Sequence, residues 1–424
     1  MRPFTDKPYR FFPPKYKPFA AKLLRAYLRH HVLPHKQRIR AVETVGGEGL
    51  GRLHESGDRL LFLPNHPTHA DGAILIEALR QRGLRTSIMA AYDVFLRGSW
   101  VAWVMQSLGG FSVDRECCDR RALSQAEATL VEGRLALTIF PEGHVYLQND
   151  EVTPFCEGAI FIGLTAARRL AKEGQRVVAV PVSIKATYVD DVRSLLVERL
   201  RTVAREVGVR LEPNMTPRAA LRAIGLEALA RNLRNRSIPF SGQGSLATNL
   251  REAAQSVLDS LDEKIQCGPD PERSPMDRIR HARRVAHEVL IDPAREVDHA
   301  AARLWSDEAT LAWRIASYSG EYVAGRPSLD RIAETLEKIE EDAFSRFVTP
   351  LAERVASVRF GPALDLGGAV GGGKGLRAAV QEVTCTMEAA VQTGLDELNR
   401  HSTHVGSDLW NEPLGCALSG DALD

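Results

Sequence analysis

Two residues that could perform proton chemistry, His66 and Asp71, have four residues between them in the polar stretch LPNHPTHADG at residues 63–72. An imidazole whose Nδ1–H is held by a carboxylate presents a basic Nε2, which is the arrangement needed to remove a proton from an alcohol. A turn that leads into a helix can bring two such side chains to hydrogen-bonding distance. The pair is therefore a candidate general base with its orienting carboxylate.

The segments on either side of this stretch must position the pair. Residues 59–63 are a short apolar run of strand length, and residues 74–79 have the apolar spacing of a helix. We therefore predict a strand-to-helix turn at residues 63–72. Catalytic side chains often lie on such turns, because the strand and the helix fix them while the loop leaves them open to a substrate.

Two other interpretations of these residues remain open. Aspartate commonly caps the N-terminus of a helix, so Asp71 could be a cap. His66, His69 and Asp71 are also types of metal ligand, and a metal-dependent hydrolase would use all three. Against this, nearby histidines in zinc sites usually stand four apart on one helix or rely on a more distant third ligand.

A second motif lies about seventy residues further along the chain, where residues 137–144 read LTIFPEGH. A pattern of Asn-His-x-x-x-x-Asp followed by a strand that ends in Phe-Pro-Glu-Gly resembles the glycerolipid acyltransferase family, the 1-acylglycerol-3-phosphate acyltransferases. Three weaker motifs also match in the expected order, at residues 109–115, 153–159 and 178–184 (GGFSVDR, TPFCEGA and VAVPVSI). The resemblance covers about residues 45–190, and a strand and helix at 350–400 fit the way in which members of the family often end. Residues 191–350 have no place in it.

This resemblance implies transfer of a fatty acyl group from an acyl thioester to the hydroxyl of a lysophospholipid such as 1-acylglycerol-3-phosphate. His66 would act as the general base and Asp71 would fix its tautomer. The substrate-binding residues that the resemblance implies are Asn65, which orders the His66 loop, Arg115, which supplies a cation for a phosphate, and Glu142 and Gly143, which help to bind the acceptor. His144 stands where the family commonly has Thr or a small residue, so the identity of the acceptor remains open.

The resemblance implies no cofactor and no metal. Acyl-CoA or acyl carrier protein would be a co-substrate, and a lysophospholipid would be the acceptor. Neither main motif contains a cysteine or serine nucleophile, which favours direct transfer between two bound substrates. Two alternatives keep the fold but change the function: an acyltransferase for an amine or another lipid acceptor, and a non-catalytic membrane scaffold.

Charge is distributed unevenly along the 424 residues, although the formal net charge is only +1. Residues 1–40 contain eleven Lys/Arg and a single acidic residue, Asp6. We predict an extended, aromatic arm over residues 1–18 and an amphipathic helix over 19–40. Six Lys/Arg within that helix would make a membrane crossing cost roughly 15–20 kcal/mol, whereas the same residues favour an anionic membrane surface.

These features predict the cellular location. Six scattered cysteines without metal or disulfide spacing are typical of a reducing compartment. We expect a cytoplasmic protein that is peripherally associated with the inner face of a membrane through residues 1–40. No feature indicates a nucleic-acid partner.

Alternation of strand and helix patterns predicts an α/β fold: a layered acyltransferase-type core with a mostly parallel sheet, plus a large helical insertion. The predicted segments are the arm and helix at 1–44, the core at 45–190, a helical insertion or second domain at 191–350, and a returning strand, C-terminal helix and tail at 351–424. Core strands are expected at 59–63, 86–91, 111–114, 135–140 and 176–188, with helices at 72–81, 118–132 and 159–172. The returning strand is expected at 354–360 and the last helix at 375–400.

Two other stretches allow more than one interpretation. The apolar residues 100–105 could belong to the core, or to an acyl-chain channel or membrane-facing surface. The glycine-rich residues 368–375 resemble a phosphate-binding loop, but Gly375 replaces the Ser or Thr that would hold Mg²⁺ after Lys374. We therefore interpret that stretch as a linker.

Overall fold

The computed structural model describes residues 8–115, 119–268, 273–370 and 375–418. The chain divides into two compact units. We call residues 10–190 and 352–407 the sheet unit, and the described parts of residues 1–9, 191–351 and 408–424 the helical unit. The phosphate-loop-like stretch falls partly outside the described residues, since Gly373 and Lys374 are not among them.

The sheet unit is built on one mixed sheet that contains eight strands within the described residues. In chain order these are β1 Ile39–Val45, β2 Arg59–Pro64, β3 Thr86–Ala91, β4 Phe111–Val113, β5 Ala136–Thr138, β6 Val177–Tyr188, β7 Arg354–Phe360 and β8 Leu364–Asp365. Their order across the sheet is β1-β7-β6-β2-β5-β3-β4, with β8 also paired to β6. Pairs β6/β7 and β6/β8 are antiparallel and the other five are parallel, so the prediction of a mostly parallel sheet is confirmed.

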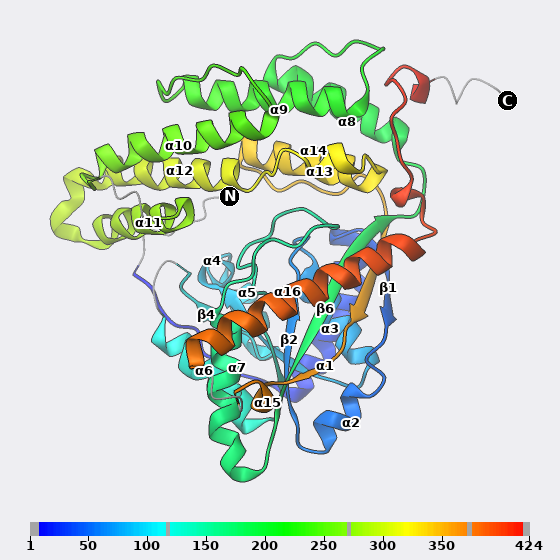
Figure 1. Cartoon of the computed structure of the whole chain (residues 1–424), viewed down its shortest axis with the longest axis vertical. Helices are drawn as coiled ribbons and strands as arrows, with labels where there is room; N and C mark the ends of the chain where they lie inside the picture. Colours follow the sequence, from blue (N-terminus) through cyan, green and yellow to red (C-terminus); the bar gives the residue numbers. More distant parts are fainter. Residues whose placement is uncertain (1–7, 116–118, 269–272, 371–374, 419–424) are drawn as a thin grey trace. The chain divides into compact units, whose positions relative to one another are not determined.

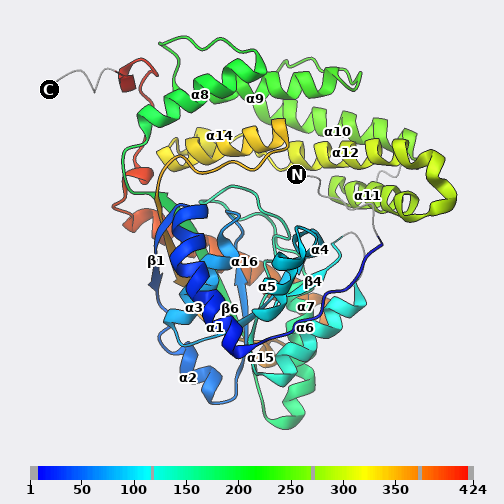
Figure 2. The ribbon, with the colours of Figure 1, turned by 180° about the vertical axis from the view of Figure 1, so that it is seen from behind.

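Helices cover both faces of this sheet, because its central strands are apolar on both sides. Every residue of β6 is buried, and so are the last five of β2. On one face lie α6 Arg120–Glu132, α7 Gly158–Leu170 and α16 Leu376–His401, in front of the sheet in Figure 1. On the other lie α3 Asp71–Gln81, α2 Leu50–Glu55 and the π-helix Leu28–Lys36, and Figure 2 shows α3 from that side. Three layers result, with β2 and β6 at the centre.

Shorter helices complete the sheet unit. They are α1 Pro18–Tyr27, α4 Tyr92–Phe95, α5 Ser99–Ser107, the 3₁₀ turn Ala171–Glu173, α15 Leu366–Val370 and the 3₁₀ turn Val405–Ser407. Before α1, the described arm is non-helical, as predicted, and its residues 10–17 belong to the sheet unit. The backbone of Phe12 exchanges hydrogen bonds with Ser112, while its ring stacks on Phe95 at a centroid distance of 5.1 Å.

Most predicted elements are confirmed to within a few residues, but the predicted helix at 19–40 is wrong at its C-terminal end. The helical segment stops at Lys36, and Arg40 lies in β1. This strand was missed because it is an edge strand that pairs with β7 alone and has mostly exposed or half-buried side chains. An edge strand lacks the apolar run that marks a central strand. The first residue of the predicted helix at 118–132 lies outside the described residues.

The helical unit confirms the helical character predicted for residues 191–350. Its helices are α8 Arg193–Val207, α9 Pro217–Arg234, α10 Leu246–Lys264, α11 Pro275–Ile291, α12 His299–Ala316, α13 Tyr322–Gly325 and α14 Leu329–Phe344, with 3₁₀ turns at Pro293–Asp298 and Cys416–Leu418. Helices α9 to α12 share an apolar core. Thr216, Ser245, Ser274 and Ser328 cap α9, α10, α11 and α14 through their side-chain oxygens. Across the part of the chain that the structure describes, no helix has both the length and the apolar character needed to cross a membrane.

Candidate active site

The site is built on the turn that joins β2 to α3, at the carboxyl end of a central strand. In sheets of this kind, ligands bind beyond the carboxyl ends of parallel strands. The Asn65 side chain fixes the turn to β6: its Nδ2 donates to the Ile184 carbonyl at 2.9 Å, and its Oδ1 accepts from the Ile184 N–H at 2.7 Å. Asn65 is almost fully buried. These contacts attach the loop to β6, and the substrate-binding role of Asn65 stays a prediction.

His66 and Asp71 lie side by side in the turn. The His66 Nδ1 is 2.8 Å from Asp71 Oδ2. In a neutral imidazole that faces an ionised carboxylate, this contact places the hydrogen on Nδ1 and leaves the lone pair on Nε2. The Asp71 side chain is fully buried, whereas that of His66 is 22% exposed. Nε2 therefore belongs to His66, which is the partly exposed residue of the pair.

Asp71 is oriented by the turn itself. Its Oδ2 also accepts from the Thr68 backbone N–H at 2.8 Å, and its Oδ1 accepts from the Thr68 hydroxyl at 2.6 Å. The N-cap position of α3 is Ala70, with no side-chain cap bond. The Asp71 carboxylate thus accepts hydrogen bonds from His66 and Thr68 and does not cap α3.

The Phe-Pro-Glu-Gly segment, residues 140–143, packs against His66. The Phe140 ring stacks on the imidazole at a centroid distance of 4.3 Å. Glu142 Oε1 accepts from the His66 backbone N–H at 2.7 Å, and the Tyr146 backbone N–H donates to the His66 carbonyl at 3.3 Å. The two sequence motifs are therefore one structural site.

Glu142 lies inside the protein, with 5% of its surface exposed. Its Oε2 accepts hydrogen bonds from the backbone N–H and the hydroxyl of Thr153. Burial raises the pKa of Glu142 to about 7, although the hydrogen bonds from Thr153 and His66 act in the opposite direction. Glu142 is thus a carboxyl group that changes protonation near neutral pH.

Arg115 reaches the same turn from the end of β4. Its Nη1 donates to the Gly143 carbonyl at 2.9 Å and lies 2.9 Å from His144 Nδ1, and its Nη2 is 3.2 Å from Asp93 Oδ1. Because a guanidinium only donates, His144 accepts through Nδ1. The Arg115 side chain is 25% exposed. Gly143 has a φ of +74°, a left-handed conformation that favours glycine at this turn.

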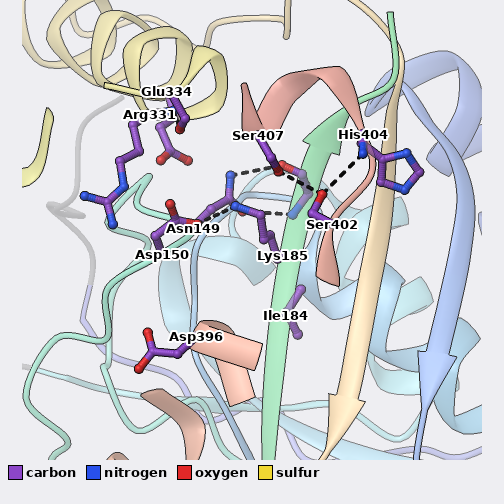
Figure 3. A network of polar contacts seen from close by, with 12 residues as sticks. Asn149, Asp150, Ile184, Lys185, Arg331, Glu334, Asp396, Ser402, His404 and Ser407 are labelled. Atoms are coloured by element: carbon purple, nitrogen blue, oxygen red, sulfur yellow. Dashed lines mark hydrogen bonds and ion pairs between the residues drawn. The ribbon is translucent and has the colours of Figure 1, made fainter. Parts of the chain in front are cut away.

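The segment that follows His144 is held by charged and amide side chains. The Asn149 side chain donates through Nδ2 to the Ala186 carbonyl and accepts through Oδ1 from the Ala186 N–H, as Asn65 does with Ile184. Asp150 forms a buried ion pair with Lys185 of β6. Figure 3 shows Asn149, Asp150 and Lys185 together beside β6. The segment is thereby attached to the same strand as the His66 loop.

Four contributors to this site were not predicted from the sequence: Thr68, Asp93, Phe140 and Thr153. Thr68, Phe140 and Thr153 lie within the sequence motifs, but the motifs did not predict what these residues contact. Asp93 lies in the short helix α4, where the sequence gives no sign of chemistry. Asp93 contributes to the site because the Arg115 side chain extends from the end of β4 to the Asp93 carboxylate.

The metal interpretation would need three ligands around one point. Among the described residues, no group of three or more His, Cys, Asp and Glu side chains is arranged to hold a metal ion. His69 is exposed, whereas Asp71 is fully buried and bonded to His66. His66, His69 and Asp71 therefore do not form a three-ligand group among the described residues.

Part of the chain matches a known protein family. Residues 41–185, about a third of the chain, match the family model described as Acyltransferase. No curated protein matches the chain. The matched segment runs from β1 to β6 and contains His66, Asp71, Arg115 and Glu142. Residues 41–185 are therefore similar to the acyltransferase family, and the match supports acyl transfer as the general chemistry of this segment.

Proposed function

We propose that this protein transfers a fatty acyl group from an acyl thioester, carried on coenzyme A or acyl carrier protein, to the hydroxyl of a lysophospholipid such as 1-acylglycerol-3-phosphate. The observation that carries the proposal is the hydrogen bond of 2.8 Å between His66 Nδ1 and Asp71 Oδ2. It leaves the imidazole Nε2 as a base within a segment that matches the acyltransferase family.

The reaction is a single exchange at the thioester carbonyl. His66 Nε2 takes the proton of the acceptor hydroxyl as its oxygen attacks the carbonyl carbon. The carbon–sulfur bond then breaks, and the imidazolium returns the proton to the departing thiolate. A positioned base of this kind contributes about 10²- to 10⁴-fold in rate.

Arg115 and Gly143 are proposed to contact the phosphate end of the acceptor. A guanidinium suits a phosphate because it can donate two parallel hydrogen bonds. The ion pair of Arg115 with Asp93 also favours a second candidate, an acceptor without a phosphate, since a phosphate would have to share the guanidinium with that carboxylate.

An acyl-transfer assay with a panel of acceptors tests the function and separates the two candidates. We expect the protein to acylate lysophosphatidate, and His66→Ala to lose at least about 10²-fold in kcat. Preference for monoacylglycerol over lysophosphatidate would select the second candidate. Transfer at the wild-type rate in His66→Ala would refute the mechanism, and no transfer to any acceptor would favour the scaffold interpretation.

We also propose that residues 1–40 attach the protein to the cytoplasmic face of an anionic membrane. Phe19, Leu23 and Tyr27 follow one another at four-residue spacing on α1 and are 77%, 57% and 45% exposed. Near α1, Trp100 and Trp103 of α5 are 61% and 37% exposed and stack on each other. Exposed aromatic and basic side chains on one surface are typical of proteins that bind the lipid headgroup region.

A further inference from the structure

We propose that Glu142 is a positioning residue for His66, and that α16 holds Glu142 in place through Thr153. The inference rests on the proposed function and assigns Glu142 a role other than binding the acceptor. It also brings into the site a helix that lies outside the segment matching the acyltransferase family.

The first step is the contact between Glu142 and the backbone of His66. The Oε1 of Glu142 accepts from the His66 N–H at 2.7 Å, which fixes the residue that carries the imidazole. The Tyr146 N–H binds the carbonyl of the same residue. His66 is thus held on both sides of its Cα by the segment that begins at Phe140.

The second step is the contact between Glu142 and Thr153. The hydroxyl and the backbone N–H of Thr153 both donate to Oε2, while Oε1 is occupied by His66. Each carboxylate oxygen therefore already has a partner within the chain. With only 5% of the residue exposed, Glu142 is placed to hold its neighbours rather than to meet a substrate.

The third step is the attachment of Thr153 to α16. The Oε1 of Gln392 accepts from the N–H of Val152 at 3.0 Å, and its Nε2 donates to the Asp150 carbonyl at 3.0 Å. One turn earlier on the helix, Glu388 Oε2 accepts from the N–H of Phe155 at 2.7 Å. Two side chains of α16 thus bind the backbone on both sides of Thr153.

The path is continuous from α16 to the base. It runs from Gln392 and Glu388 to the backbone around Thr153, from Thr153 to Glu142, and from Glu142 to the N–H of His66. Displacement of a reacting group by about 1 Å can cost about 10²-fold in rate. Loss of any link should therefore lower the rate of transfer more than it weakens the binding of substrate.

The test measures kcat and the KM for each substrate in the full-length protein, using lysophosphatidate and an acyl-CoA, or the acceptor that the panel selects. Glu142→Ala removes the carboxylate, and Glu142→Gln keeps an acceptor oxygen for the His66 N–H. Thr153→Val removes the hydroxyl at constant shape, and Thr153→Ser restores it. Gln392→Ala cuts the link to α16, and Gln381→Ala is its control, because Gln381 is exposed on the same helix.

We expect Glu142→Ala to lower kcat by about 10²-fold with the acceptor KM within about twofold of wild type. Thr153→Ser should restore most of the lost kcat, whereas Glu142→Gln should restore only part of it, because its amide nitrogen cannot accept from the Thr153 N–H. Gln392→Ala should lower kcat while Gln381→Ala does not. A rise in the acceptor KM at unchanged kcat in Glu142→Ala would overturn the inference and support acceptor binding by Glu142. Wild-type kcat in both Thr153→Val and Gln392→Ala would overturn the link to α16.

The same measurements separate failure of the inference from failure of the proposed function. A wild-type protein that transfers no acyl group to any acceptor in the panel contradicts the proposed function. An active wild type with Glu142 variants that change only KM contradicts the inference alone. If Glu142→Ala does not fold, as judged by circular dichroism, Glu142→Gln and the Thr153 pair still decide.

Discussion

At the scale of single residues, the site depends on two buried carboxyl groups with different environments. Asp71 accepts three hydrogen bonds, from His66 and from the backbone and hydroxyl of Thr68. Glu142 has a pKa raised to about 7 by burial. One carboxyl group orients a base, and the other holds the loop that carries it.

The role of Thr68 in orienting Asp71 can be tested by removing its hydroxyl. Thr68→Val keeps the shape of the side chain but leaves Asp71 Oδ1 without its bond of 2.6 Å. Asp71→Asn removes the charge that favours Nδ1–H in His66. We expect Asp71→Asn to lower kcat by about 10²- to 10⁴-fold and Thr68→Val to lower it less. Thr68→Ser should retain most activity, and equal losses in Thr68→Ser and Thr68→Val would count against the hydroxyl.

The pKa of Glu142 makes a prediction about stability and pH. Its pKa is about 7 in the folded protein and 4.5 without burial. The folded state therefore binds more protons between these two values, so this carboxyl group destabilises the fold progressively as pH rises from about 4.5 to about 7. The total effect is about 3 kcal/mol. Urea unfolding at pH 5 and pH 8 should show a smaller loss of stability with rising pH in Glu142→Gln than in wild type. An identical loss in the two proteins would contradict a raised pKa.

The ion pair between Lys185 and Asp150 should matter because it is buried. Both side chains are at most 2% exposed, so Asp150→Asn would remove a carboxylate that is paired with a buried ammonium. We expect the free energy of unfolding to fall by about 3–5 kcal/mol. The control is Asp191→Asn, since the ion pair of Asp191 with Arg193 is 52% and 32% exposed and should contribute less than about 1 kcal/mol. Similar losses in the two variants would show that burial does not decide the effect.

At the scale of elements, α16 joins the C-terminal part of the sheet unit to the site. It packs on β6, where the Ser183 hydroxyl donates to the Val391 carbonyl at 2.7 Å. Gly394 permits this close approach, because a Cβ at that position would overlap the Ser183 hydroxyl. The same helix also binds the segment around Thr153 through Gln392 and Glu388.

Substitution of two helical glycines tests this packing. Gly394→Ala should destabilise the protein by about 1–3 kcal/mol, because it inserts a methyl group into a filled contact. Gly158, the first residue of α7, has no atom within 4 Å of a Cβ built on it. Gly158→Ala should therefore be neutral or stabilising by up to about 1 kcal/mol. Equal effects on the urea midpoint would contradict the close packing of α16 on β6.

At the scale of the whole molecule, charge is separated along the chain. Residues 1–40 contain eleven Lys/Arg and one acidic residue, while the complete chain has a net charge of only +1. The remaining residues are therefore acidic in sum. This uneven charge supports the proposed attachment of residues 1–40 to an anionic surface.

This charge separation predicts how binding to vesicles depends on salt and on aromatic residues. Binding to vesicles that contain anionic phospholipid should weaken as salt is raised from about 0.05 to 0.5 M, because the charges are screened over shorter distances. Phe19→Ser together with Leu23→Ser should reduce the binding that remains at high salt. As a control, Val297→Ser changes a residue that is 92% exposed in the helical unit. Unchanged binding after removal of residues 1–40 would eliminate the proposed attachment.

The sequence by itself determined the layered α/β core, the central strands and the helical block at 191–350. It did so because apolar periodicity reflects burial, and burial is nearly complete in β2 and β6. It also marked His66 and Asp71, because residues five positions apart can meet within one turn. It failed at β1, whose polar edge lacks that periodicity.

Only the tertiary structure decided how the loops around His66 are held. Asp93 approaches Arg115, and Gln392 approaches Val152, across 22 and 240 positions of the chain. Such contacts depend on the order of the strands and on where α16 returns to the sheet, and no local pattern of residues encodes either. The chemistry of the site was therefore readable from short motifs, whereas its support came from distant segments brought together by folding.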